Sequence, residues 1–157
     1  MKVKSGAIED YLATLSETPL RLAACTAGLD DACLHSPPDL DDWSLARLLA
    51  HLRAAAEVWG ESIHAMLAQE QPEIPDVHPN ARLKSAGYDK LEFHASLQVY
   101  AEQRQALLEA LRSLPLEAWS RPATIRGRAH TVFSQVRRMA LHEADHWEQI
   151  ERLCQVE

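Results

Sequence analysis

The stretch Leu45–Gln69, LARLLAHLRAAAEVWGESIHAMLAQ, decides the fold class of this chain. Its apolar residues recur at the three- to four-residue spacing of an α-helix, and they keep this period for about six turns. Ser44, directly before the stretch, can cap the helix with its side-chain oxygen. The side predicted to face a core carries Leu45, Leu48, Leu49, Leu52, Ala56, Trp59, Ile63 and Met66. We therefore expect a long amphipathic helix here.

Three further stretches carry apolar stripes of the same period, at about residues 7–27, 89–113 and 131–155. Gly28 is a natural C-terminal stop for the first of these helices, and Pro115 ends the second. The second is expected to bury Leu91 near its start, and Thr131 can cap the third. Four helices that are apolar along one side are what a four-helix bundle requires.

Pro19 lies inside the first predicted helix, where its ring removes one backbone hydrogen bond and predicts a kink or a short break. Prolines also interrupt the connections at residues 71–87 and 114–130, which we expect to be irregular. Because β-branched residues do not cluster anywhere, little of the chain favours a sheet. The sequence therefore predicts an all-α fold, a four-helix bundle.

The length of 157 residues is most simply one domain, residues 1–157, which can bury a core without disulfides. Cys25, Cys33 and Cys154 are odd in number and form no C-x-x-C pair, which favours a reducing compartment over a disulfide framework. No segment approaches ~18 uninterrupted apolar residues, and the N-terminus lacks the apolar stretch of a signal peptide. We expect a cytoplasmic protein that does not span a membrane.

The net charge of −7, from 23 acidic and 16 basic residues, repels phosphate backbones and makes nucleic acid an unfavourable partner. A local group of arginines, Arg126, Arg128, Arg137 and Arg138, runs against this trend. Such a group most often forms a solvated face. The alternative is a site for an anionic substrate or for a thiol cofactor that carries a carboxylate.

The segment Leu141–Ile150, LHEADHWEQI, places His142 and His146 four residues apart, so that both imidazoles lie within ~40° on one side of a helix and can bind one divalent metal. It also matches H-E-x-x-H, the pattern of zinc peptidases. Those enzymes normally take their third ligand from downstream. Only 11 residues follow His146, without a histidine or a glycine, so the peptidase interpretation is disfavoured.

His51 is the best upstream candidate for a third ligand, because it borders the apolar stripe of the helix at residues 45–69. It lies ~10 Å from the start of that helix, and His146 lies ~14 Å from the end of the last one, so antiparallel helices would bring them to similar depth. That arrangement needs a crossover after residue 69. The segment 71–87 can extend up to ~55 Å, against ~39 Å for the helix.

Glu143 falls at the centre of the apolar face of the last helix, where a carboxylate is rarely buried without a partner. One explanation is a salt bridge or a hydrogen bond inside the bundle. The other is support of the metal ligands or general-base catalysis near the metal. Asp145 is expected to be exposed, although it could hold a ligand imidazole by its second nitrogen.

In this order and spacing, several residues along nearly the whole chain resemble the DinB-like family of metal-binding four-helix bundles. They are Trp43-Ser44, His51-Leu52, Phe93, Arg104, Trp119-Ser120-Arg121, Gly127 and His142-Glu143-Ala144-Asp145-His146. The resemblance implies an up-down-down-up bundle with a long crossover between its second and third helices. It also implies a divalent metal, commonly nickel or zinc, bound by His51, His142 and His146.

The resemblance implies a class of activity more than one reaction. Some members of the family are transferases that use a low-molecular-weight thiol such as bacillithiol or mycothiol, some are thiol-dependent isomerases, and others are described as metal-dependent hydrolases. Family members commonly form dimers, so a homodimer is expected. We expect a metal-dependent enzyme that acts on a small molecule, with thiol transfer preferred and Glu143 catalytic only in a hydrolase. The alternative is a non-catalytic metal-binding or stress-response bundle protein.

Overall fold

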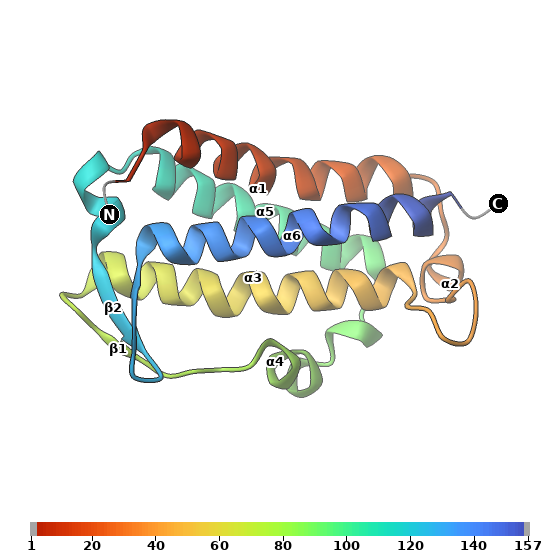
Figure 1. Cartoon of the computed structure of the whole chain (residues 1–157). Coiled ribbons are helices and arrows are strands. Elements are labelled where there is room, and N and C mark those ends of the chain that lie inside the picture. Colours follow the sequence, from red (N-terminus) through yellow and green to blue (C-terminus); the bar gives the residue numbers. More distant parts are fainter. Residues whose placement is uncertain (1–2, 156–157) are drawn as a thin grey trace.

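Four long helices form the bundle in the computed structural model, which describes residues 3–155 and leaves residues 1–2 and 156–157 of the expected domain outside. They are α1 (Ser5–Thr26), α3 (Leu45–Ala68), α5 (Phe93–Arg112) and α6 (Val132–Cys154). Figure 1 shows α1 and α6 running in one direction and α3 and α5 in the other. α6 and α5 each pack against both α1 and α3. The predicted up-down-down-up bundle is thus confirmed.

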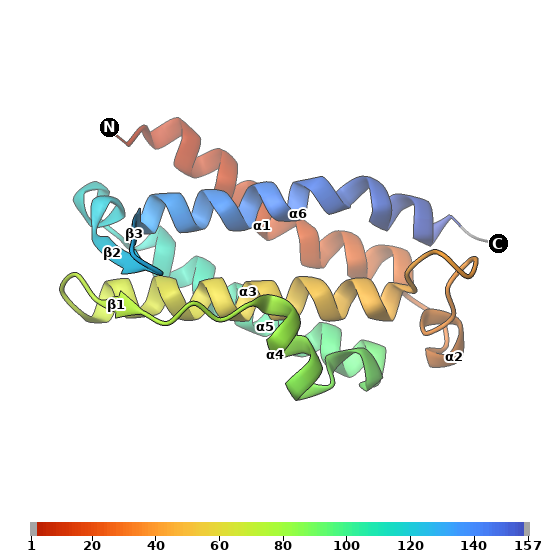
Figure 2. The same ribbon diagram turned by 60° about the horizontal axis from the view of Figure 1, so that its bottom comes forward.

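The connection between α3 and α5 sets this topology. After Ala68 the chain returns along the outside of α3 through the short strand β1 (Glu73–Ile74) and the helix α4 (Pro79–Ala86), as Figure 2 shows. Leu83 of α4 is buried against α3. Because the chain travels back before α5 begins, α3 and α5 are parallel and α3 and α6 are antiparallel.

The expectation of irregular connections is wrong at several places. Residues 71–87 contain β1 and α4, and residues 114–130 contain the 3₁₀ turn η2 (Leu116–Ser120), the strand β2 (Pro122–Ile125) and most of the strand β3 (Arg128–Thr131). Outside these two connections the structure also contains the short helix α2 (Asp31–Leu34) and the 3₁₀ turn η1 (Tyr88–Lys90). The strands form one small sheet in the order β1-β2-β3, in which β1 is parallel to β2 and β2 is antiparallel to β3. Strands of two to four residues are too short to show an alternating pattern.

The turn between β2 and β3 consists of Arg126 and Gly127, whose φ angles are +52° and +73°. A two-residue hairpin turn with two positive φ angles matches the right-handed twist of the strands, and glycine takes this conformation without strain. Arg126 takes the same left-handed conformation with a side chain, which L-residues rarely do. The hairpin therefore holds Arg126 in an unusual conformation at its tip.

The helix ends agree with the capping signals except at the start of α5. Ser44 accepts a hydrogen bond from the Arg47 backbone, and Thr131 forms a capping box with Ser134. The third long helix begins at Phe93 instead of residue 89, because the Glu92 side chain caps it and η1 precedes it. Leu91, expected to be buried, is therefore 39% exposed.

α1 continues through Pro19, so the expected break is absent from it. Proline has no N–H for the carbonyl of Leu15, four residues earlier. Arg104 of α5 supplies the missing donor, since its Nη1 lies 2.7 Å from that carbonyl oxygen. The backbone acceptor that Pro19 leaves open is thus used to join α5 to α1.

The core of the bundle has two large apolar clusters, one towards each end, and a third small cluster joins α4 to α3. Along α6, the first cluster includes Val132, Val136, Met139 and Ala140, and the second includes Ile150 and Leu153. His142, Glu143 and His146 lie between them in the sequence of α6. Within residues 3–155, no helix is long and apolar enough to cross a membrane.

The cysteine count favoured a reducing compartment over a disulfide framework, but two of the three cysteines are paired. Cys25 at the end of α1 and Cys154 at the end of α6 form a disulfide, with their Cα atoms 5.7 Å apart and a sequence separation of 129. Cys33 is free and exposed. The pairing follows from the parallel packing of α1 and α6, which brings the same ends of both helices together.

Reduction of this disulfide is expected to lower the free energy of unfolding by about 2–4 kcal/mol, because the bond closes a long loop in the unfolded chain. Urea denaturation with and without reductant measures the difference, and Cys25→Ser should lose the same amount. Cys33→Ser serves as the control and should leave the stability unchanged. Three reactive thiols in the denatured, unreduced protein would contradict the pairing.

Candidate metal centre

Three histidines from two antiparallel helices converge halfway along the bundle. His51 comes from α3, and His142 and His146 lie one turn apart on α6. One ring nitrogen of each lies within 4.8 Å of the others, and the Nε2 atoms of His51 and His142 are 2.9 Å apart. All three side chains are half-buried. The structure therefore brings together the three residues that the sequence analysis selected.

The environment keeps two of these imidazoles neutral. Burial, with the neighbouring imidazoles as the next cause, lowers the pKa of His51 and of His142 to about 4. A neutral imidazole offers a lone pair on one nitrogen, which is the form that binds a metal. At neutral pH His51 and His142 therefore present uncharged nitrogen donors that face each other. Three imidazole donors form a set that fits a divalent zinc or nickel ion.

Gln149 orients the third imidazole. Its Oε1 lies 2.8 Å from Nδ1 of His146, so Nδ1 donates to it and Nε2 remains free to bind. The sequence analysis had considered Asp145 for such a role, but Asp145 is exposed. Gln149 could have been found from the helix period, because it lies three residues after His146 and within ~20° of His142 around the axis.

Two tryptophans border the histidines. The Trp43 ring lies 5.3 Å from the ring of His51 and stacks against His146 at 6.5 Å, measured between centroids. The Trp59 ring contacts His142 edge-on at 5.0 Å. These apolar surfaces limit the access of water to the imidazoles and contribute to the burial that lowers the pKa of His51 and of His142.

A cavity of about 330 Å³ opens beside His51 and His142. Its walls come from four places in the chain: α3, α6, the segment 75–80 and the tip of the β2–β3 hairpin. Trp59, Gln135 and Arg138 line it together with the two histidines. This volume is at the lower end of the range for small-molecule sites. The candidate metal centre thus adjoins a space that fits a small molecule.

Glu143 points into the core, where it is 1% exposed and paired with Arg104. Nη1 of Arg104 donates to Oε1 at 2.8 Å, Nη2 donates to Oε2, and the Tyr100 hydroxyl donates to Oε2 at 3.1 Å. Both carboxylate oxygens are therefore engaged. Of the two explanations for this residue, the placement favours the salt bridge inside the bundle over general-base catalysis.

The arginines of the predicted basic group divide into two pairs. All four are exposed, but Arg126 and Arg138 line the cavity beside the histidines, whereas Arg128 and Arg137 do not. Arg126 is paired with Asp76 at 3.2 Å. The guanidinium of Arg138 lies 4.7 Å from the centre of the Trp59 ring. Half of the group thus borders the candidate site and half forms a solvated face.

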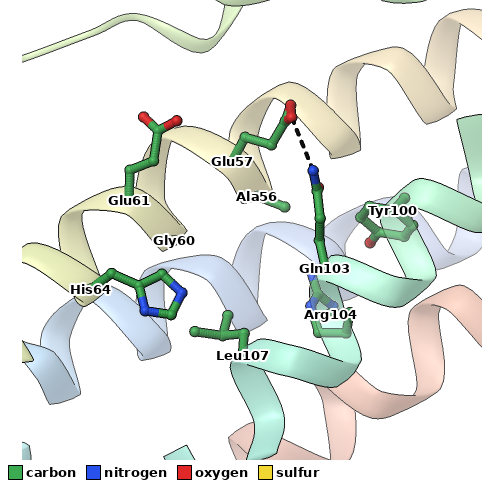
Figure 3. A pocket seen from close by; sticks show the side chains of 9 residues that line it. All are labelled: Ala56, Glu57, Gly60, Glu61, His64, Tyr100, Gln103, Arg104 and Leu107. Atoms are coloured by element: carbon green, nitrogen blue, oxygen red, sulfur yellow. Dashed lines mark hydrogen bonds between the residues drawn. The ribbon is translucent and has the colours of Figure 1, made fainter. Parts of the chain in front are cut away.

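A second cavity of about 210 Å³ lies between α3 and α5. Figure 3 shows Glu57, Glu61 and His64 along α3, with Gln103 of α5 bonded to Glu57. Arg104, which binds Glu143, also borders this cavity. None of the three clustered histidines does. Arg104 therefore connects the border of this second cavity to Glu143 of α6, and the candidate metal centre adjoins a different cavity.

Replacement of Gln149 by leucine is expected to weaken metal binding by about 10- to 100-fold, because His146 loses the acceptor that fixes its ring. The stability of the metal-free protein should change little, since Gln149 is only half-buried. Competition with a chromophoric chelator measures the affinity. Glu148→Gln, an exposed neighbour on the same helix, is the control. Equal affinities in the two variants would contradict the role of Gln149.

The metal-free protein is expected to lose stability as the pH falls from about 6.5 to 4. The unfolded chain takes up protons at His51 and His142 near pH 6.5, whereas the lowered pKa of both groups keeps them neutral in the folded chain down to about pH 4. Above pH 6.5 these two groups contribute no pH dependence. Urea denaturation in the presence of chelator at several pH values measures the effect. An equally steep loss in the His51→Ala/His142→Ala variant would contradict it.

Comparison with known proteins adds a family and a fold. The family model described as the DinB superfamily matches residues 14–150. The structure is similar to that of YfiT from Bacillus subtilis, described as a probable metal-dependent hydrolase with an unusual four-helix bundle topology. The two share 18% sequence identity at a TM-score of 0.81, over 96% of this chain and 87% of that chain. Comparison with curated proteins gives no match.

Proposed function

Because the chain belongs to the DinB superfamily, we propose that it is a metal-dependent enzyme that acts on a small molecule, with His51, His142 and His146 as the metal ligands. The observation that carries this proposal is the convergence of three imidazole nitrogens within 4.8 Å, beside a cavity of about 330 Å³. The similarity to YfiT, itself described as a probable metal-dependent hydrolase, is consistent with it.

The donor set suits nickel or zinc. A divalent cation held by three neutral imidazoles supplies a Lewis acid with vacant positions, which lowers the pKa of a thiol or of water. Gln149 holds His146 in the binding orientation, and Trp43 and Trp59 keep the imidazoles partly dry. The chain's own residues therefore position the ligands and exclude water.

Between the two reactions, the contacts of Glu143 favour thiol transfer. Hydrolysis would use a carboxylate as a general base on water, and both oxygens of Glu143 already accept hydrogen bonds from Arg104 and Tyr100. Thiol transfer needs no buried carboxylate as a base, because a thiol whose pKa the metal would lower can release its proton to solvent. A low-molecular-weight thiol would then be the second substrate. Hydrolysis is the second candidate, and the similarity to YfiT favours it.

A direct test begins with the metal content of the purified protein, followed by loading with zinc or nickel. The loaded protein is then assayed with an electrophile such as 1-chloro-2,4-dinitrobenzene and bacillithiol, mycothiol or glutathione, and in parallel with a panel of esters and amides. Thiol transfer should depend on both the metal and the thiol. Hydrolysis without any thiol would favour the second candidate.

Glu143→Gln separates the two reactions further. Loss of activity with the metal retained and the fold intact would favour hydrolysis, whereas unchanged turnover would remove Glu143 from the chemistry. If the protein neither carries nor takes up one metal ion per chain, the enzyme proposal fails. The non-catalytic bundle, with a role in binding or in a stress response, then remains.

A further inference from the structure

A fully buried glutamine amide lines the cavity beside the histidines, and only one of its two polar atoms has a hydrogen-bond partner. Gln135 is 0% exposed, and its Nε2 lies 3.1 Å from Nδ1 of His130. Its Oε1 is buried and has no hydrogen-bond partner among the described residues. A buried oxygen left without a donor costs roughly 1–3 kcal/mol. The contact with His130 assigns Nε2 as the donor and leaves Oε1 as a buried acceptor directly behind the lining of the cavity, which a ligand reaches when a neighbouring side chain moves.

The same wall holds one positive charge without a partner. Within residues 3–155, no carboxylate lies at ion-pair distance from Arg138, whereas Arg126, the other arginine of the cavity, is paired with Asp76. The guanidinium of Arg138 rests on the Trp59 ring, which fixes the plane of its donors. A planar guanidinium matches a carboxylate with two parallel hydrogen bonds.

These groups stand in one row with a histidine of the centre. Gln135, Arg138 and His142 all lie on α6, within ~60° of one another around its axis. Arg138 lies ~6 Å along the axis from His142, and Gln135 lies ~4.5 Å beyond Arg138. A ligand of a few carbon atoms can therefore reach Arg138 with one group and Gln135 with another while its remaining part lies at the histidines.

We propose that the substrate of the histidine centre is a small carboxylic acid that also carries a hydroxyl or amide N–H, with the carboxylate on Arg138 and the donor on Oε1 of Gln135. This inference rests on the proposed function, whose substrate class it names. A single free guanidinium suits one carboxylate better than a phosphate dianion. The spacing of the two groups suits a donor a few bonds from the carboxylate.

The probe for this subsite is 3-hydroxybutyrate, which carries both groups. Three compounds each test one feature: 3-hydroxybutyramide lacks the charge, butyrate lacks the donor, and inorganic phosphate is a different anion. NMR titration of the zinc-loaded protein measures the dissociation constants. 3-Hydroxybutyrate should bind at least about tenfold more tightly than the amide, and more tightly than butyrate or phosphate. Equal binding of the amide, or tighter binding of phosphate, would overturn the proposal.

Variants locate the two contacts. Arg138→Gln should weaken the binding of 3-hydroxybutyrate at least about tenfold. The control variant Arg137→Gln changes a neighbouring arginine that does not line the cavity, and it should leave the affinity unaffected. Gln135→Leu keeps the side chain buried and should abolish only the preference over butyrate. Equal losses in Arg137→Gln and Arg138→Gln would overturn the inference, as would a preference retained in Gln135→Leu.

Zinc content, measured on the same samples, separates the two proposals. Stoichiometric zinc without a carboxylate preference overturns the substrate class alone, and the metal centre stands. If zinc does not bind to the wild-type protein, the proposed function itself fails. Zinc retained at the wild-type level in Arg138→Gln and Gln135→Leu shows that these changes act on the ligand and not on the histidines.

Discussion

Replacement of His142 by alanine is expected to weaken metal binding by more than ~100-fold, the upper end of what loss of an orienting partner costs. The three imidazole rings form a nearly equilateral triangle, with centroids 4.8–4.9 Å apart, and Nε2 of His142 faces Nε2 of His51 at 2.9 Å. Without His142, two imidazoles from different helices remain. Two imidazoles bind a divalent metal more weakly than three.

Competition titration with a chromophoric chelator measures this loss for zinc and for nickel. His64→Ala is the matched control, because His64 lies on α3, is exposed and borders only the second cavity. It should bind metal as the wild type does. Retention of wild-type affinity in His142→Ala, or an equal loss in His64→Ala, would show that the metal binds elsewhere on the protein.

Replacement of Arg104 by methionine is expected to lower the free energy of unfolding by about 3–5 kcal/mol, because it leaves Glu143 as a buried charge without a partner. Burial alone makes this large, since Glu143 is 1% exposed and Arg104 is 3% exposed. The change also removes the donor to the Leu15 carbonyl, whose helical partner is missing at Pro19. One substitution thus leaves two buried polar groups, the Glu143 carboxylate and the Leu15 carbonyl, without the partner that Arg104 provides.

Urea denaturation of the variants measures the effect. Arg104→Met combined with Glu143→Leu removes both charges and should recover a large part of the lost stability. The Leu15 carbonyl still lacks a hydrogen-bond donor in the double variant, so the recovery of stability should be incomplete. A loss below ~1 kcal/mol in Arg104→Met would contradict the buried pair as a main support of the bundle.

The sequence predicted the helices well where the signal was local. The period of residues 45–69, the cap at Ser44 and the capping residue Thr131 each depend on neighbours within a few residues, and the structure confirms them. The expectations that failed depend on distant partners. Pro19 keeps its helix because Arg104, 85 residues later, satisfies the open carbonyl, and Cys25 pairs with Cys154 across the bundle.

The candidate site was predictable in part. His142 and His146 follow from one helical turn. His51 followed from its place beside the apolar stripe, from the depth it would share with His146 in antiparallel helices, and from the resemblance to the family, and the crossover provides that packing. Gln149 and Gln135 were missed, although both lie on the same side of α6 as the histidines. The cavity could not have been predicted, because its walls include the segment 75–80 and the hairpin tip, which have no pattern in common.

The sequence by itself determined the four amphipathic helices and which of their residues can bind a metal, because the helix period is a property of nearby residues. Only the tertiary structure decided which helices run antiparallel, which buried charge meets Glu143 and what lies beside the histidines. Those outcomes depend on packing between segments tens of residues apart, and a local pattern does not specify its partner. Glu143 illustrates both halves: its position predicted burial, and only Arg104 and Tyr100 showed what holds it.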